Sequence, residues 1–165
     1  MTLIRFGAQQ SISMASGEKV ILIAEDSPDE VLIMKCVFAK TNLPFELRFV
    51  ANGQEAIDYL ERKAPYESAD KSPKPSVMIL DLKMPLMDGF EVLAWLKLQP
   101  AFGDIPTVVH SSSSMLEDRE RAKQLGARAY YVKGSGPGEL MEMFKAVGEK
   151  WLKTDTNAEV LRANP

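Results

Sequence analysis

The sequence contains a single cysteine and a single histidine. Cys36 cannot form a disulfide within the chain, and it lies in an apolar stretch, so we expect a buried core thiol rather than a reactive one. His110 ends the apolar run Val108–Val109. A histidine in that setting is typical of a core or surface residue, and we assign it no role.

An excess of positive charge and a long apolar run are also missing. The net charge is −3, so a nucleic-acid partner is not expected. No apolar run approaches the roughly 18 residues that a membrane span needs. Met1–Gly17 lacks the apolar core of a secretory signal. We therefore expect a cytoplasmic protein without a membrane partner.

The 165 residues fit one domain with tails. We expect a flexible N-terminal segment over residues 1–18, a folded domain over 19–153 and a polar tail over 154–165.

Strand and helix signals alternate through the expected domain. Short β-branched or apolar runs predict strands, and apolar residues at helical spacing predict the helices between them. The predicted strands are 20–25, 45–51, 77–81, 105–110 and 128–132, and the predicted helices are 28–40, 54–63, 89–99, 114–125 and 137–152. This order predicts an α/β fold, a doubly wound five-stranded parallel sheet of the flavodoxin-like order 2-1-3-4-5.

Local signals add detail to the helices and loops. Ser27 with Glu30, and Ser114 with Glu117, predict capping boxes at two helix starts. The helix over 28–40 is apolar nearly all round, which indicates either an interface, as in a homodimer, or a well-covered core helix. The helix over 114–125 has few apolar residues and should pack loosely. The long connection over 63–76 is either a solvated spacer or a mobile, functional segment.

Charged residues follow three of the predicted strands. Glu25 and Asp26 end the first strand, Asp81 ends the third and Lys133 ends the fifth. Parallel strands bring these ends to one edge of the sheet, where open α/β folds bind ligands. Three crowded carboxylates call for a neutralising cation, and Mg²⁺ prefers such oxygen ligands. The alternative is a solvated acidic rim, but a lysine at the end of a buried strand needs an anionic partner.

Asp81 is a candidate nucleophile, since a carboxylate can form an acyl phosphate. Ser111 follows the fourth strand and could donate to an anion at the same edge. It also begins a run of four serines, and one of them is expected to cap the next helix.

These segments resemble the receiver domain of two-component response regulators. The resemblance rests on Glu25–Asp26, on 81–93 (DLKMPLMDGFEVL) and on 126–133 (GARAYYVK). It implies that Asp81 accepts a phosphoryl group from a phosphohistidine of a sensor kinase. It also implies that Asp26, Asp81 and the backbone carbonyl of Lys83 hold Mg²⁺, while Glu25 orients its waters.

The same resemblance assigns the remaining roles. Lys133 would contact the phosphoryl group, Ser111 would hydrogen-bond to it, and Tyr130 would swing inward as a switch. Such a protein is a phosphoacceptor rather than an enzyme, although it promotes its own phosphorylation and dephosphorylation. Its output would be a protein contact or relay to a histidine phosphotransfer protein. The connection over 63–76 resembles that of stand-alone receivers linked to phytochrome-type or hybrid kinases.

Three other interpretations compete with this one. A Mg²⁺-dependent aspartyl-phosphate phosphohydrolase would place a second Asp where Lys83 stands. A flavodoxin-like cofactor module would need a phosphate loop where Glu25–Asp26 would repel phosphate. A degenerate receiver, binding partners without phosphate, stays open because Gly134 stands where the family has a proline after a cis bond. A trans bond is expected before Gly134.

Overall fold

The sheet has the predicted topology. The computed structural model describes residues 19–134 and 136–152, so the expected flexible segment over 1–18 and the tail over 154–165 lie outside the described residues. Five parallel strands lie in the order β2-β1-β3-β4-β5. The elements in chain order are β1 (Val20–Ala24), α1 (Pro28–Ala39), β2 (Glu46–Val50), α2 (Gly53–Glu61), β3 (Val77–Leu80), α3 (Gly89–Lys97), β4 (Thr107–Ser111), α4 (Leu116–Gln124), β5 (Ala129–Val132) and α5 (Pro137–Trp151).

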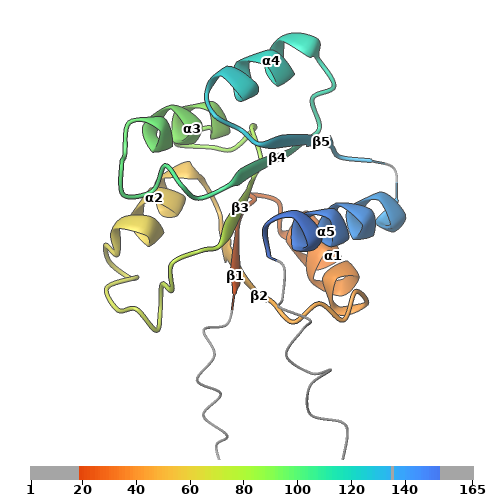
Figure 1. Ribbon diagram of the computed structural model, residues 1–165, viewed down its shortest axis with the longest axis horizontal. Coiled ribbons are helices and arrows are strands. Elements are labelled where there is room, and N and C mark those ends of the chain that lie inside the picture. The colour runs from red at the N-terminus through yellow and green to blue at the C-terminus, as the bar shows by residue number, and fades with distance from the viewer. Residues whose placement is uncertain (1–18, 135, 153–165) are drawn as a thin grey trace, which may run out of the picture.

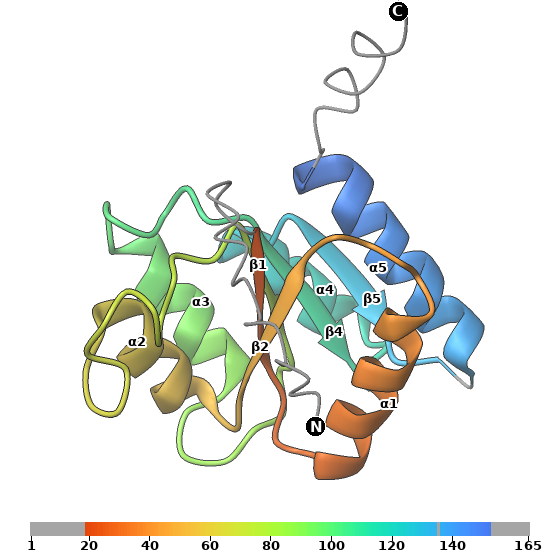
Figure 2. The ribbon, with the colours of Figure 1, turned by 90° about the horizontal axis from the view of Figure 1, so that it is seen from below.

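Helices cover both faces of the sheet, and each face has its own core. Helices α1 and α5 lie on one face, and α2, α3 and α4 lie on the other (Figures 1 and 2). Side chains of one strand alternate between the two cores: Ile21 and Ile23 pack toward α1 and α5, whereas Leu22 and Ala24 pack toward the other helices. All of β1, β3 and β4 is buried. Burial on both faces explains the continuous apolar sequences of β1 and β3, whereas β4 also buries the polar residues Thr107, His110 and Ser111.

Helix α1 begins as predicted but without a complete capping box. The Ser27 hydroxyl accepts a hydrogen bond from the Glu30 N–H at 3.3 Å. In a capping box the Glu30 carboxylate would accept from the Ser27 N–H, but here that N–H donates to Glu25 Oε1 at 3.1 Å instead. The start of this helix is therefore tied to the acidic residue that ends β1.

The capping box predicted at Ser114 is wrong. Helix α4 begins at Leu116 with Met115 as its N-cap residue, and no side chain caps it. The expectation that one of the serines caps this helix also fails. Ser113 instead donates a hydrogen bond from its hydroxyl to Asp118 and accepts one from the Met115 N–H at 3.4 Å. Ala122 is the only buried residue of α4, as its sparse apolar content predicted.

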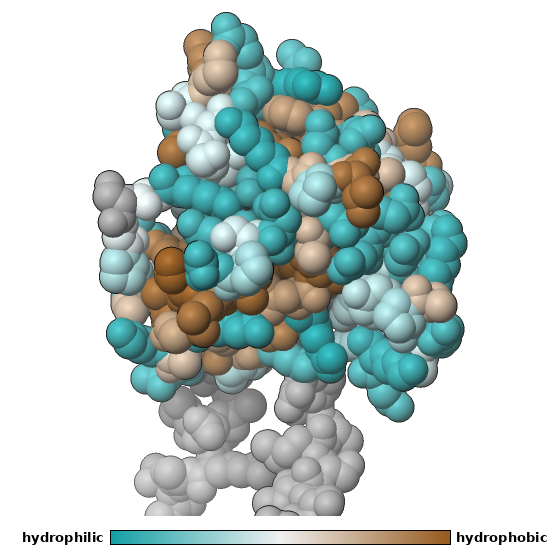
Figure 3. Space-filling view, turned by 180° about the vertical axis from the view of Figure 1, so that it is seen from behind, coloured by the Kyte–Doolittle hydropathy of each residue, from teal (hydrophilic) through white to brown (hydrophobic). Residues whose placement is uncertain are grey.

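The prediction of a buried Cys36 is also wrong, because this side chain is exposed. Only Met34 and Val37 of α1 are buried, and Leu32 and Ile33 are 61% and 47% exposed. A helix that is apolar all round gives no sequence signal for which side meets the sheet. Figure 3 shows apolar side chains gathered on the side where α1 lies. Of the two explanations for this helix, the well-covered core helix does not hold, and the interface stays a prediction.

The connection between α2 and β3 is anchored rather than a free spacer. The Tyr59 hydroxyl donates to the Pro73 carbonyl at 2.9 Å, and the Tyr66 ring packs against the Tyr59 ring with centroids 5.3 Å apart. The buried Ser72 hydroxyl lies 2.8 Å from the Tyr66 carbonyl, to which it donates. None of the helices in the described ranges is long and apolar enough to cross a membrane.

Candidate metal centre at the sheet edge

The backbone ladder of the sheet continues one residue beyond three strands and holds the charged residues in place. The Glu25 N–H donates to the Val50 carbonyl at 3.0 Å, and the Asp81 N–H donates to the Ala24 carbonyl at 3.0 Å. On the other side of the site, the Lys133 N–H donates to the Ser111 carbonyl at 2.8 Å. The polar residues thus sit on regular strand backbone at the carboxyl edge, where the parallel topology was predicted to bring them.

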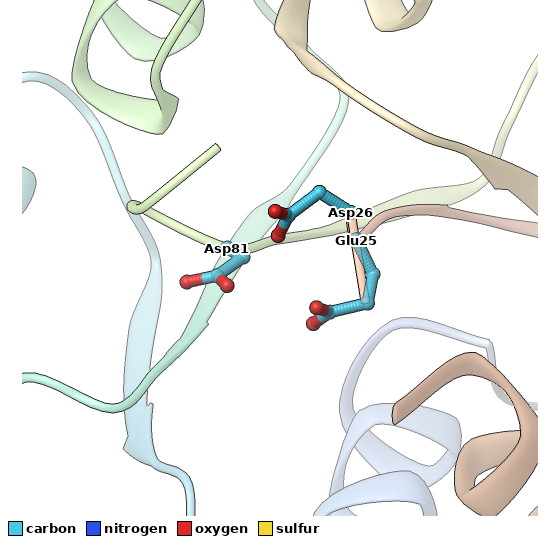
Figure 4. A group of neighbouring side chains, drawn as sticks. All are labelled: Glu25, Asp26 and Asp81. Carbon is cyan, nitrogen blue, oxygen red and sulfur yellow. The ribbon is translucent and has the colours of Figure 1, made fainter. Parts of the chain in front are cut away.

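Three carboxylates meet at this edge. Glu25, Asp26 and Asp81 each place an oxygen within 4.8 Å of the others (Figure 4). Glu25 is 3% exposed and Asp81 is 5% exposed, while Asp26 lies at the exposed rim. Like charges at this spacing repel one another, and burial strengthens the repulsion because water no longer screens it.

Lys133 forms an ion pair with each of the two buried acids. Its Nζ lies 2.7 Å from Glu25 Oε2 and 2.9 Å from Asp81 Oδ2. Burial raises the pKa of Glu25, and the hydrogen bond from Lys133 opposes that rise. Burial alone would lower the pKa of Lys133, but its bonds to Glu25 and Asp81 outweigh that effect and raise it. The lysine is therefore held as an ammonium.

The charge that remains fits a divalent cation. One ammonium faces three carboxylates, so the ionised cluster keeps an excess of two negative charges. Carboxylate oxygens at an open rim are the ligands that Mg²⁺ prefers, together with water and phosphate oxygens. The Lys83 N–H donates to Asp81 Oδ1 at 3.2 Å and so orients that carboxylate. The role of the Lys83 carbonyl as a metal ligand stays a prediction.

Ser111 and Tyr130 meet in the segment that leads to α4. Ser111 is fully buried, and its hydroxyl accepts a hydrogen bond from the Ser113 N–H at 3.4 Å. The Tyr130 hydroxyl donates to the Ser113 carbonyl at 2.9 Å, and the Arg119 guanidinium lies 5.3 Å from the centre of the Tyr130 ring. Burial raises the pKa of Tyr130, so its hydroxyl remains a donor at neutral pH. Ser113, which sequence reasoning missed, thus connects Ser111 to Tyr130.

Gly134 departs from the family pattern without displacing Lys133. The peptide bond before Gly134 is trans, as expected, since the one cis bond in the described ranges precedes Pro65. A Cβ atom at Gly134 would overlap the Glu139 carboxylate, because that side chain lies against the Gly134 backbone. Glycine therefore leaves room for Glu139 in the loop, while Lys133 still reaches both buried acids.

His110 is a second residue that sequence reasoning left without a role. It is 6% exposed, and its Nδ1 has no hydrogen-bond partner among the described residues. Burial, together with the nearby charge of Lys133, lowers the pKa of His110 to about 4, so the imidazole is neutral at physiological pH. Alternation along the strand could have indicated that His110 is buried. His110 lies on the same face of β4 as Val108, and that face packs toward α1 and α5.

Comparisons with known proteins agree on one family. The model of the response regulator receiver domain matches residues 21–145. Response regulator Rcp1 of Synechocystis sp. is 33% identical over 138 residues, which span 84% of this chain and 92% of that protein. The Mn²⁺-bound form of Rcp1 superposes with a TM-score of 0.72 at 33% identity, over 84% of this chain and 97% of that one. The phosphorylated cyanobacterial phytochrome response regulator RcpA gives a TM-score of 0.74 at 32% identity, with the same coverage.

Proposed function

The chain belongs to the response regulator receiver family, whose members are phosphoacceptor switches, and we propose that Asp81 is the residue that accepts the phosphoryl group. The observation that carries this proposal is the position of Lys133. Its ammonium touches Asp81 and Glu25 at the buried end of the sheet. Phosphoryl transfer depends mainly on positioning and charge neutralisation, and this lysine supplies both to Asp81.

The proposed reaction is a displacement at phosphorus. A carboxylate oxygen of Asp81 forms a bond to the phosphorus of a phosphohistidine, and the phosphorus–nitrogen bond breaks, which returns the electron pair to the imidazole. Lys133 would move from its bonds to the carboxylates toward the new phosphoryl oxygens. The Lys83 N–H would hold the Asp81 carboxylate in orientation during the transfer.

The acid cluster is proposed to hold Mg²⁺ through Asp26, Asp81 and the backbone carbonyl of Lys83, with Glu25 orienting bound water. A bound magnesium ion would supply charge neutralisation for the transferred group. Two observations support this assignment: the carboxylate oxygens cluster within 4.8 Å of one another, and the relative Rcp1 has been crystallised with Mn²⁺.

We propose that the buried Ser111 hydroxyl forms a hydrogen bond to the phosphoryl group once Asp81 is phosphorylated. A phosphorylated aspartate adds strong acceptor oxygens, and Ser111 would turn its hydroxyl proton toward one of them. The Ser113 N–H now bonds to that hydroxyl, and the Ser113 carbonyl accepts from Tyr130. A shift of Ser111 would therefore disturb the bonds that position the start of α4 and the Tyr130 ring.

The donor is proposed to be a sensor histidine kinase or a histidine phosphotransfer protein. A kinase of the phytochrome type is favoured, because RcpA is a phytochrome response regulator and shares 32% identity with this chain. Since such kinases use ATP, the reaction is expected in the cytoplasm. The output would be a contact with another protein or onward relay of the phosphoryl group.

The experiment that tests the proposal is intact-mass analysis after incubation with acetyl phosphate and Mg²⁺. We expect wild-type protein to gain one phosphoryl group, and chelation of the metal to prevent the gain. Asp81→Asn should gain none, while Asp104→Asn, which changes an exposed loop aspartate, should behave as wild type. Labelling of Asp81→Asn at the wild-type rate would contradict the assignment. No labelling of either protein by acetyl phosphate or a phosphorylated kinase, with the fold intact by circular dichroism, would indicate a degenerate receiver.

A further inference from the structure

His110 stands between Lys133 and the acids that Lys133 binds. Strand β4 lies between β3 and β5 in the sheet (Figure 1). The register pairs Leu80 with Val109, so Asp81 and His110, each one residue further on, lie side by side. Alternation along the strands puts Asp81, His110 and Lys133 on the same face, the one that α1 and α5 cover.

The Lys133 side chain crosses β4 to reach its partners. Its Nζ lies 2.9 Å from Asp81 Oδ2 at the end of β3 and 2.7 Å from Glu25 Oε2 at the end of β1. Neighbouring strands are about 4.8 Å apart, so the backbone of β3 lies about 10 Å from that of β5. The lysine stem therefore passes over β4 beside His110. After burial, the charges of Lys133 and Asp81 are the largest influences on the pKa of His110, as expected for a ring near both.

The imidazole supports the lysine stem through the space that it fills. His110 is buried, and its Nδ1 has no hydrogen-bond partner among the described residues, so no bond at that nitrogen holds Lys133. Because its pKa lies at about 4, the ring is uncharged at neutral pH and does not repel the ammonium. A fixed neutral ring beside a flexible stem excludes rotamers that would otherwise compete with the bound one.

A smaller side chain at this position would open other partners to the ammonium. A cavity of about 900 Å³ lies between α1 and α5, and both His110 and Lys133 border it. Glu30 and Glu139 border it as well, and neither has a salt bridge within the part of the chain that the structure describes. Without the ring, the lysine stem would be free to turn toward these carboxylates and away from the acid cluster.

We propose that His110 is a positioning residue for phosphoryl transfer, whose ring holds the Lys133 side chain over β4 so that its ammonium stays on Asp81 and Glu25. The role rests on the proposed function of Asp81, because His110 acts through the lysine that pairs with this carboxylate. His110 itself takes no part in the bond changes.

Two variants separate the volume of the ring from its polarity. His110→Phe keeps a flat ring and loses the nitrogens, whereas His110→Asn keeps a polar group and loses the ring. The first readout is the rate of phosphoryl gain from acetyl phosphate with Mg²⁺, followed by intact mass. We expect His110→Phe to stay within about twofold of wild type and His110→Asn to react about tenfold more slowly, since small displacements of a catalytic group have large effects on rate.

The second readout is the side-chain ammonium signal of Lys133 in ¹H–¹⁵N NMR spectra recorded without phosphodonor or metal. Its absence from Lys133→Arg identifies the signal. It should be sharp in wild type and His110→Phe, and shifted or lost in His110→Asn. Val108→Ala is the matched control, because Val108 lies fully buried on the same face of β4 but does not border the cavity. This control should lower stability and leave both the signal and the rate unchanged.

Three results would overturn the proposal: a wild-type signal and rate in His110→Asn, equal losses in His110→Phe and His110→Asn, or the same losses in Val108→Ala. If His110→Phe does not fold, His110→Leu takes its place as the variant that keeps the volume, with the same expectation. Failure of the proposed function is distinguishable. If acetyl phosphate labels no protein, the role of Asp81 is contradicted, while the ammonium spectra, which need no phosphodonor, still test whether His110 positions Lys133.

Discussion

The two sides of the candidate phosphorylation site are built differently. On one side, Glu25 and Asp81 extend strands that are buried along their whole length, and Lys133 bonds to both of them. On the other side, the segment from Ser112 to Leu125 has one buried helical residue, Ala122, and no side-chain cap at its helix start. The first side is a rigid edge that fixes charges, and the second is a weakly held segment. Weakly packed elements open and move at the lowest free-energy cost. The second side is therefore suited to change its conformation when Asp81 is phosphorylated.

The largest expected effect concerns the rigid edge. Lys133→Met keeps the length of the side chain but leaves two buried carboxylates without their partner. Removing one member of a buried ion pair typically costs about 3–5 kcal/mol. We expect Lys133→Met to lower the free energy of unfolding by roughly 3 kcal/mol at neutral pH without divalent metal, measured by urea denaturation.

Lys145→Met is the matched control for that change. Lys145 pairs with Glu142 at 3.0 Å on the exposed side of α5, and exposed pairs contribute little. This variant should change stability by less than about 0.5 kcal/mol. Equally small losses in both variants would show that the edge is not held by its buried charges.

A second test is the pH dependence of the free energy of unfolding, to which the buried His110 contributes. Burial favours neutral His110 in the folded state, with a pKa of about 4, against an ordinary value of 6.5. The unfolded chain therefore binds this proton first. The resulting stability is complete above pH 6.5 and is lost as the pH falls toward 4, by at most about 3 kcal/mol at 1.36 kcal/mol per unit.

His110→Asn removes this titration and isolates it from that of the carboxylates. Urea denaturation between pH 7 and pH 4 should show a smaller loss of stability for His110→Asn than for wild type. Parallel curves for the two proteins would mean that His110 is not buried in its neutral form.

The smallest expected effect on stability concerns the responsive segment. Tyr130→Phe removes the hydrogen bond from the tyrosine hydroxyl to the Ser113 carbonyl, which should cost about 1 kcal/mol. Faster amide exchange at Ser113 and Met115, with unchanged exchange in β1 and β3, would show that the loss is local.

Tyr131→Phe provides the comparison on the same strand, because the Tyr131 hydroxyl has no hydrogen bond among the described residues. It should leave both stability and exchange near the wild-type values. If Tyr130→Phe also accelerated amide exchange in β1 and β3, the rigid edge and the responsive segment would not move independently.

Sequence reasoning identified the features that depend on regular backbone. Continuous apolar strands dictate a sheet covered on both faces, and residues at the ends of parallel strands must lie along one edge. Glu25, Asp81 and Lys133 could thus be grouped from their places in the sequence alone. The alternation of side chains along the strands is equally regular, and it divides the residues of β1 between the two cores.

The features that sequence reasoning missed depend on which of several possible packing or hydrogen-bond partners a residue adopts in the fold. Cys36 lies on an apolar helix with no polar side, so only packing decides which residues face the sheet. Ser114 matches a capping pattern, but Ser113 and Asp118 bond to each other and the helix begins later. His110 has a lowered pKa because it is buried on the sheet face that α1 and α5 cover, and these helices are distant from it in the chain.

The measurement that tests this account most directly is the amide NMR spectrum of wild type and Asp81→Asn in Mg²⁺, before and after acetyl phosphate is added. The account predicts large shifts in wild type at 111–116 and at Tyr130, small shifts in the first residues of β1 and β3, and no change in Asp81→Asn. Shifts in wild type that stop at the residues touching Asp81, with 111–116 and Tyr130 unmoved, would contradict it.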